Sequence, residues 1–386
     1  MTVIINALGG LENPNLALTR PQGDNPVDSS APDVDARAIL DTHAAGVTAV
    51  NVTLGYVGGV DEPFEYTIRT VGVWDAILRR NAADLVKIHT AADIQAAEKS
   101  GKIGVIYGFQ NGAMMGRDAS RAGIFADLGV RVIQLTYNPA NQIGHGCMSV
   151  EDGCLSAFGH EVVESLNGSR IMVDLSHSGT QTCLDAARAS QAPVSINHTG
   201  CRAMTDLPRN KSDEELRLVA SKGGFVGIYF MPFLKSDGHP GAEDVAAHID
   251  HAIDVCGEDH VGIGTDGCYA DRRSRRLWRV SCEAGRGPPQ ERPGRYRRTR
   301  RFLPFRGGPQ RRGPVPQAVA SAQSARPSGS AHRENSRPQF SALCARRVGC
   351  VSGNILGCRA PLVSHKCDLR HRAGDAPVSA FIARVM

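Results

Sequence analysis

The chain has 386 residues, of which 41% are hydrophobic, and a net charge of +5. It can therefore bury a large core, and it exceeds the roughly 250 residues of one β/α barrel. No apolar stretch is long enough for a membrane span, and Met1 to Asn6 lacks a signal-peptide pattern. Eleven cysteines without a CxxC pair indicate neither a disulfide framework nor a zinc ribbon. These features favour a cytoplasmic protein.

Strand-like and helix-like segments alternate through residues 1–267. Eight strands are predicted at Val3–Leu8, Val47–Thr53, Ile103–Phe109, Val130–Thr136, Ile171–Leu175, Pro193–Ile196, Gly224–Phe230 and His260–Gly264. Helices are predicted at Val73–Arg80, Ala91–Lys99, Asp118–Leu128, Gly159–Leu166, Thr180–Ala189, Ser212–Lys222 and Ala242–Cys256. Because consecutive parallel strands need helical crossovers, the alternation predicts an α/β fold, a distorted (β/α)8 TIM-type barrel.

Two histidines stand just past neighbouring predicted strands. His177 follows IMVDL, and His198 follows PVSI and precedes Arg202. In a β/α barrel, side chains at the carboxyl ends of strands face one mouth, so these histidines can meet at a metal or substrate. A single such histidine would more often cap a strand by hydrogen bonding. Two of them, with a nearby arginine and the strand-end acid Asp266, favour a site.

From Cys268 onward the composition changes to arginine, proline and glycine, with no sustained helical or strand period. Residues 268–386 are predicted to be a basic, irregular or disordered tail, of the kind that also binds nucleic acid. A reading-frame shift in a GC-rich gene explains the composition better. Asn335 to Arg347, for example, can be encoded so that dropping one nucleotide gives ILGPNFLRFARDV, an amphipathic helix. The underlying nucleotide sequence would decide between these explanations.

Several motifs together resemble the membrane (renal) dipeptidases, which are zinc metallopeptidases on a distorted β/α barrel. The motifs are LTYNPAN from Leu135, SAFGHEVVESLN from Ser156, DLSH ending at His177, NHTGCRA from Asn197 and GIGTDG ending at Gly267. Their order and spacing, over about residues 3–267, carry the resemblance. It implies a metal-dependent hydrolase that acts on dipeptides or similar small amides with a free carboxylate.

The resemblance also implies roles for individual residues. Family members bind two zinc ions, one of them through two histidines that match His177 and His198. The arginine after the second histidine, here Arg202, is expected to bind the substrate carboxylate, because its guanidinium can do so through two hydrogen bonds. Asp266, at the end of the last strand, is expected to handle the proton of the attacking water.

The sequence departs from the family at the remaining metal ligands. The family's HxD falls on Leu8 and Gly10, neither of which binds zinc, and its bridging glutamate falls on Gln110. Loss of that negative charge disfavours two closely spaced dications. Tyr137 replaces a histidine near the scissile carbonyl and becomes the candidate catalytic group there. At most one zinc ion is therefore expected, held by the two histidines with Gln110 lining the substrate site.

Three classes of function follow from these observations. The first is a one-metal hydrolase whose activity is weakened or lost. The second is a non-catalytic barrel that binds a small carboxylate ligand. The third, a nucleic-acid-binding arm, ranks last, because the tail has almost no lysine and the frame shift accounts for its composition. No specific nucleic-acid partner is expected, and a homo-oligomer stays open.

Overall fold

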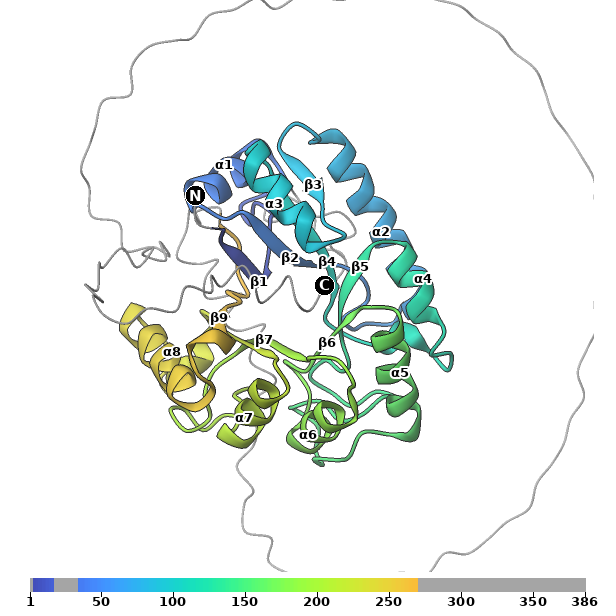
Figure 1. Cartoon of the computed structure of the whole chain (residues 1–386), viewed down its shortest axis with the longest axis vertical. Coiled ribbons are helices and arrows are strands. Elements are labelled where there is room, and N and C mark those ends of the chain that lie inside the picture. Colours follow the sequence, from blue (N-terminus) through green and yellow to red (C-terminus); the bar gives the residue numbers. More distant parts are fainter. Residues whose placement is uncertain (1–2, 17–33, 270–386) are drawn as a thin grey trace, which may run out of the picture. The chain divides into compact units, whose positions relative to one another are not determined.

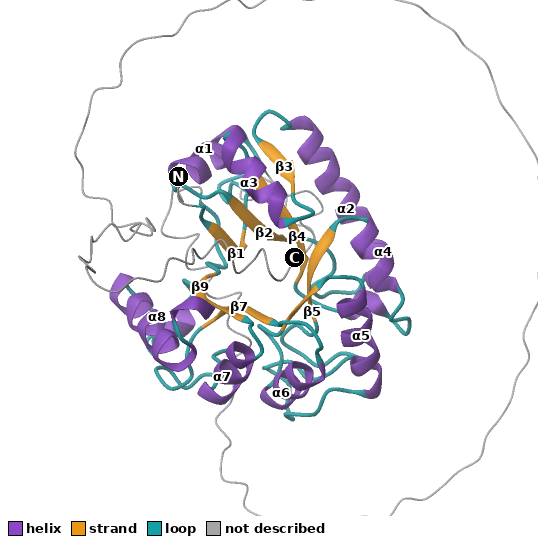
Figure 2. Cartoon of the chain, viewed as in Figure 1, coloured by secondary structure: helices purple, strands orange, loops and turns teal. Residues whose placement is uncertain are grey.

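The computed structural model describes residues 3–16 and 34–269. Eight parallel strands follow one another in the order β1-β2-β4-β5-β6-β7-β8-β9, and β3 pairs with β4 off this path. The strands are β1 (Ile5–Gly9), β2 (Ala49–Thr53), β3 (Leu85–Lys87), β4 (Ile103–Phe109), β5 (Val130–Gln134), β6 (Met172–Asp174), β7 (Ser195–Thr199), β8 (Phe225–Ile228) and β9 (Val261–Ile263). Helices surround them (Figures 1 and 2). The predicted (β/α)8 barrel is confirmed.

The helices lie outside the strands and bury one face each against them. They are α1 (Ala36–Ala44), α2 (Pro63–Arg80), α3 (Ala91–Ser100), α4 (Arg121–Asp127), α5 (Ala157–Gly168), α6 (Thr180–Ala189), α7 (Asp213–Ser221) and α8 (Ala242–Cys256). Several begin at a side chain that accepts from the first turn, as Ser156 does for α5 and Ser212 for α7. Such caps satisfy backbone N–H groups that have no partner inside the helix.

The seam between β1 and β9 closes the barrel through a few contacts rather than a full ladder. The Asp266 N–H donates to Leu8 O, and the Gly10 N–H donates to Gly267 O, both at 3.0 Å. The side chain of Asn6 adds two further bonds, because its Oδ1 accepts from the Thr265 N–H and its Nδ2 donates to Thr265 Oγ1. The chain just after β9 is thereby fixed against β1.

Every one of the eight predicted strands has its counterpart on the path of the barrel. The structure adds β3, and α2 begins ten residues before the predicted helix. The predicted tail lies outside the described residues from position 270 onward. Within the described ranges, none of the helices is both long and apolar enough to cross a bilayer.

Candidate active site

His177 and His198 meet at the carboxyl ends of β6 and β7. Their Nε2 atoms lie 2.9 Å apart, and both residues are buried. Two nitrogen ligands of a tetrahedral zinc ion, each about 2.0–2.1 Å from the metal, lie about 3.3 Å apart. The observed 2.9 Å is a hydrogen-bond separation, about 0.4 Å shorter than this, so the rings would have to move apart slightly to hold one ion between them.

The ring orientation of His177 is fixed from both sides. Its Nδ1 lies 2.7 Å from Asn138 Oδ1, and because an amide oxygen only accepts, Nδ1 carries the proton. The Tyr137 ring stacks on the imidazole, with centroids 4.4 Å apart and an angle of 26° between the planes. With the proton on Nδ1, Nε2 presents its lone pair towards His198, as a metal ligand must.

A buried network below the histidines holds the main chain that carries them. Asp174 Oδ1 accepts from the N–H groups of Ser176 and Asn197, and the Ser176 hydroxyl accepts from the His198 N–H. Asp174 thus positions both histidines through the backbone of the two loops and not through their rings. His198 Nδ1 is buried without a hydrogen-bond partner.

Both histidines are kept neutral by their surroundings. Burial is the largest cause, and it lowers the pKa of His177 and of His198 well below the usual value of 6.5. The charges of Arg209 and Lys211 lower both pKa values further. Zinc binds neutral imidazole, so an environment that opposes protonation leaves the nitrogens available near neutral pH.

Gln110 and Tyr137 also face this histidine pair. Gln110 Nε2 lies 3.2 Å from His198 Nε2. The resemblance to membrane dipeptidases implies a bridging acid at this position. A half-turn of the amide would present Oε1 instead, a neutral oxygen donor. Burial, and then the nearby charge of Asp266, raise the pKa of Tyr137 above its usual value, so this phenol stays protonated and can donate a hydrogen bond.

Asp266 stands at the seam of the barrel in a left-handed backbone conformation, with φ of 54°. Such a conformation is uncommon for residues other than glycine, and it is often found at functional sites. Burial raises the pKa of its carboxyl group, whereas the charge of Arg209 acts in the opposite direction. A raised pKa makes a carboxylate a better proton acceptor near neutral pH.

Two arginines follow β7, and they have different surroundings. The Arg202 guanidinium donates to Asn210 O at 3.1 Å and to Thr180 Oγ1 at 3.2 Å. Arg209 is buried and donates to the carbonyl oxygens of Ser176 and His198, at 2.6 and 3.0 Å. Arg209 is thus bonded directly to the main chain of His198, whereas the bonds of Arg202 lead to the start of α6.

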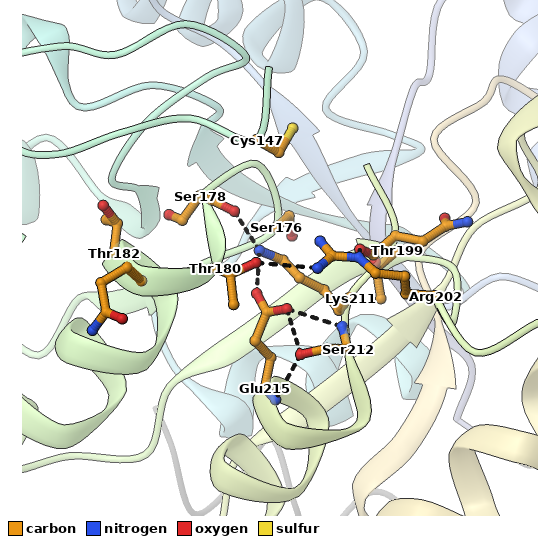
Figure 3. Close-up of polar contacts among 12 residues, drawn as sticks. Cys147, Ser176, Ser178, Thr180, Thr182, Thr199, Arg202, Lys211, Ser212 and Glu215 are labelled. Carbon is orange, nitrogen blue, oxygen red and sulfur yellow. Dashed lines mark hydrogen bonds and ion pairs between the residues drawn. The ribbon is translucent and has the colours of Figure 1, made fainter. Parts of the chain in front are cut away.

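A buried ion pair supports the same loops from outside the site (Figure 3). Lys211 Nζ lies 3.0 Å from Glu215 Oε1, and both side chains are almost fully buried. The ammonium also donates to Ser178 O, next to His177, while Glu215 Oε2 accepts from the N–H and hydroxyl of Ser212. The pair therefore ties the β6 loop to the beginning of α7.

The set of metal-binding side chains around the two histidines is small. Within the described ranges no group of three or more histidine, cysteine, aspartate or glutamate side chains could hold a metal. Leu8 is an apolar, buried residue, and Gly10 offers no side chain. The histidine pair could hold one ion together with water or substrate, and a paired centre finds no bridging acid.

Sequence reasoning did not find three residues that shape the site. Asn138 follows Tyr137 in LTYNPAN, and its place directly after a predicted strand was the available signal. Arg209 and Lys211 lie in the same loop as Arg202. Nothing in the local sequence distinguishes which of these cations is buried.

Comparison with known proteins assigns the family. The sequence profile of membrane dipeptidases, peptidase family M19, matches residues 31–272. The chain belongs to the M19 membrane dipeptidase family. It shares 32% identity over 208 residues with an uncharacterised dipeptidase of Schizosaccharomyces pombe, covering 52% of this chain and 50% of that one. This M19 chain therefore spans about half the length of that curated relative.

Solved structures agree with this M19 assignment. An amidohydrolase from Pseudomonas aeruginosa shares 32% identity and a TM-score of 0.60, covering 69% of this chain and 74% of that one. A metallopeptidase from Rhodobacter sphaeroides, solved with a phosphinate mimic of the dipeptide L-Ala-D-Ala, shares the fold at 22% identity and a TM-score of 0.59, covering 75% and 94%. The M19 chain thus shares its barrel fold with both of these proteins.

Proposed function

We propose that this protein hydrolyses a dipeptide, or a similar small amide with a free carboxylate, with one zinc ion held by His177 and His198. The observation that carries the proposal is the 2.9 Å approach of the two Nε2 atoms. The proton on His177 Nδ1 leaves the facing nitrogen as a lone-pair donor. Weak activity is expected, because Gln110 replaces the bridging acid, and Leu8 and Gly10 replace the HxD of the first strand.

A zinc ion bound there would polarise the scissile carbonyl and lower the pKa of a water molecule. In this proposal Asp266 accepts the proton of the attacking water and then delivers it to the leaving amine. The protonated phenol of Tyr137 donates to the carbonyl oxygen as negative charge develops on it. Arg202 binds the substrate carboxylate.

The direct test is zinc titration of the chelator-treated full chain, followed by a panel of dipeptides. We expect at most one zinc per chain, and we expect His177→Ala and His198→Ala to lose both the zinc and any turnover. His160→Ala is the matched control, since His160 is exposed on α5. Two tightly held zinc ions, or an activity that resists chelators, would contradict the proposal.

The alternative is a barrel that binds a small carboxylate without catalysis. It is favoured by a specific observation, the neutral Gln110 amide beside His198 in place of an acid. If the protein binds dipeptides or their free-carboxylate analogues in calorimetry but turns over none with zinc present, this alternative replaces the hydrolase. In that case Arg202→Ala should weaken binding while His160→Ala leaves it unchanged.

A further inference from the structure

His248 reaches from α8 into the chain that follows β7. It is one of two fully buried residues of this helix, the other being Ala252. Its Nδ1 lies 2.9 Å from the backbone nitrogen of Cys201, and its Nε2 lies 2.9 Å from Leu234 O. A backbone N–H can only donate and a carbonyl oxygen can only accept, so Nδ1 is the acceptor and Nε2 carries the proton. His248 thus joins the chain after β7 to the chain after β8.

Residues 200–211, called the arginine loop below, follow β7 and carry Arg202. The two ends of the loop are joined, because the Arg202 N–H donates to Lys211 O at 2.8 Å and the Lys211 N–H donates to Gly200 O at 3.0 Å. Cys201 lies between these two bonds, and its carbonyl oxygen accepts from two N–H groups of the following turn, both at 3.1 Å. A group that fixes Cys201 therefore also fixes the main chain of Arg202.

The two nitrogens of His248 differ in what their loss would leave behind. Among the described residues, the Cys201 N–H has no second acceptor, and Cys201 is fully buried. Leu234 O, in contrast, has a second donor, since the Thr205 hydroxyl lies 2.8 Å from it. A buried N–H without a partner is costly, whereas a carbonyl oxygen that keeps one donor is not. The bond to Nδ1 is therefore the one that holds the arginine loop.

We propose that His248 is a positioning residue for substrate binding, because its bond to the Cys201 N–H holds the arginine loop where Arg202 meets the start of α6. The Arg202 guanidinium donates there to Thr180 Oγ1 at 3.2 Å. This inference rests on the proposed function in assigning the substrate carboxylate to Arg202. The side chain of His248 bonds to the arginine loop and to Leu234, not to the histidine pair. It should therefore control substrate affinity and leave zinc binding and the chemical step unchanged.

Two variants separate the roles of the two nitrogens. His248→Asn places an amide oxygen near the position of Nδ1, where it can accept from the Cys201 N–H, whereas His248→Gln places an amide nitrogen near Nε2 and keeps the bond to Leu234 O. Hydrogen exchange in residues 201–205 of the full chain, measured by mass spectrometry, reports how firmly the loop is held. We expect exchange at least about tenfold faster in His248→Gln and in His248→Leu, and within about threefold of the wild type in His248→Asn. His251→Gln removes the bond from α8 to Asp213, so it is the control for a general loosening of the helix and should leave residues 201–205 unchanged.

Substrate binding by the zinc-loaded protein is the second measurement. His248→Gln should raise the Kd or KM for dipeptides about tenfold with kcat within about twofold, and His248→Asn should restore the wild-type values. Three results would overturn the proposal: exchange in His248→Gln equal to that of the wild type, no rescue by His248→Asn, or a lower kcat at unchanged KM. If His248→Leu fails to fold, the comparison of the Asn and Gln variants still decides. A wild type that binds no dipeptide overturns the proposed function instead, and the exchange experiment then decides by itself whether His248 holds the loop.

Discussion

The buried pair of Lys211 and Glu215 allows a quantitative prediction about stability. Lys211→Met removes the cation but leaves the Glu215 carboxylate enclosed, with the two bonds from Ser212 and no positive charge beside it. Breaking a buried ion pair by removing one partner costs about 3–5 kcal/mol. The side chains are only 1% and 0% exposed, so solvent cannot take over the role of the missing partner.

The double variant Lys211→Met/Glu215→Leu should be more stable than the single variants suggest. It leaves no uncompensated charge, and what remains lost is the cap at Ser212, about 1 kcal/mol, and the bond to Ser178 O, about 1–3 kcal/mol. Replacing both members of a buried pair by apolar residues can even be neutral. We therefore expect a coupling free energy of at least about 2 kcal/mol in the double-mutant cycle.

Urea denaturation, followed by fluorescence and circular dichroism, measures the four free energies of unfolding in this cycle. The two signals must coincide for a two-state treatment. Arg217→Met is the control, since Arg217 contacts Asp213 at 3.5 Å on the exposed side of the same helix and should change stability by less than about 1 kcal/mol. Additive effects of the two buried substitutions would show that packing, rather than charge pairing, stabilises this region.

Four further predictions concern the site itself. Gln110→Glu should raise zinc affinity in calorimetry, because it adds a negative ligand beside His198; an unchanged affinity would argue that the amide faces away from the ion. Asn138→Ala should weaken zinc binding about 10–100-fold by freeing the His177 ring, with little change in the melting temperature of the metal-free protein. If turnover is found, Arg202→Ala should raise KM more than Arg188→Ala does, and equal effects would remove Arg202 from the substrate site. In metal-free protein the two buried histidines have low pKa values, so the unfolded chain binds protons before the folded chain does as pH falls below about 6.5. The free energy of unfolding should therefore decrease by about 1.4 kcal/mol per pH unit for each buried histidine. Asp174 and Asp266 have raised pKa values and act in the opposite direction, so the measured quantity is the difference in slope between wild type and His198→Gln.

The barrel could be predicted because buried parallel strands appear as continuous apolar runs, and eight such runs alternate with capped helices. The strand β3 was missed, since Leu85–Lys87 is three residues long and carries no pattern of its own. Strand ends also indicated where His177 and His198 would meet. The buried cations could not be predicted in the same way. The burial of Arg209 and Lys211 depends on carbonyl oxygens that other segments supply. Glu215, the ion-pair partner of Lys211, is only four residues away, but its own burial is not evident from the local sequence.

The position of Glu12 illustrates the same limit at shorter range. Sequence analysis showed that position 10 lacks an acid, but not that a carboxylate two residues later folds back into the vacant space. A glycine and a nearby acid carry no periodic signal. The place of this carboxylate becomes visible only when the distances around Gly10 are known.

The closing seam has a consequence for the order in which the site can form during folding. Asn6 and Thr265, whose side chains and backbone join β1 to the chain after β9, are 259 positions apart in sequence. His177 and His198 are 21 positions apart, on adjacent strands. Contacts that close long loops carry a larger entropy cost and tend to form late. During folding, the two histidines can therefore come together before Asp266 joins the end of the barrel. A zinc ion that binds at that stage would bind a barrel whose β1–β9 seam is still open.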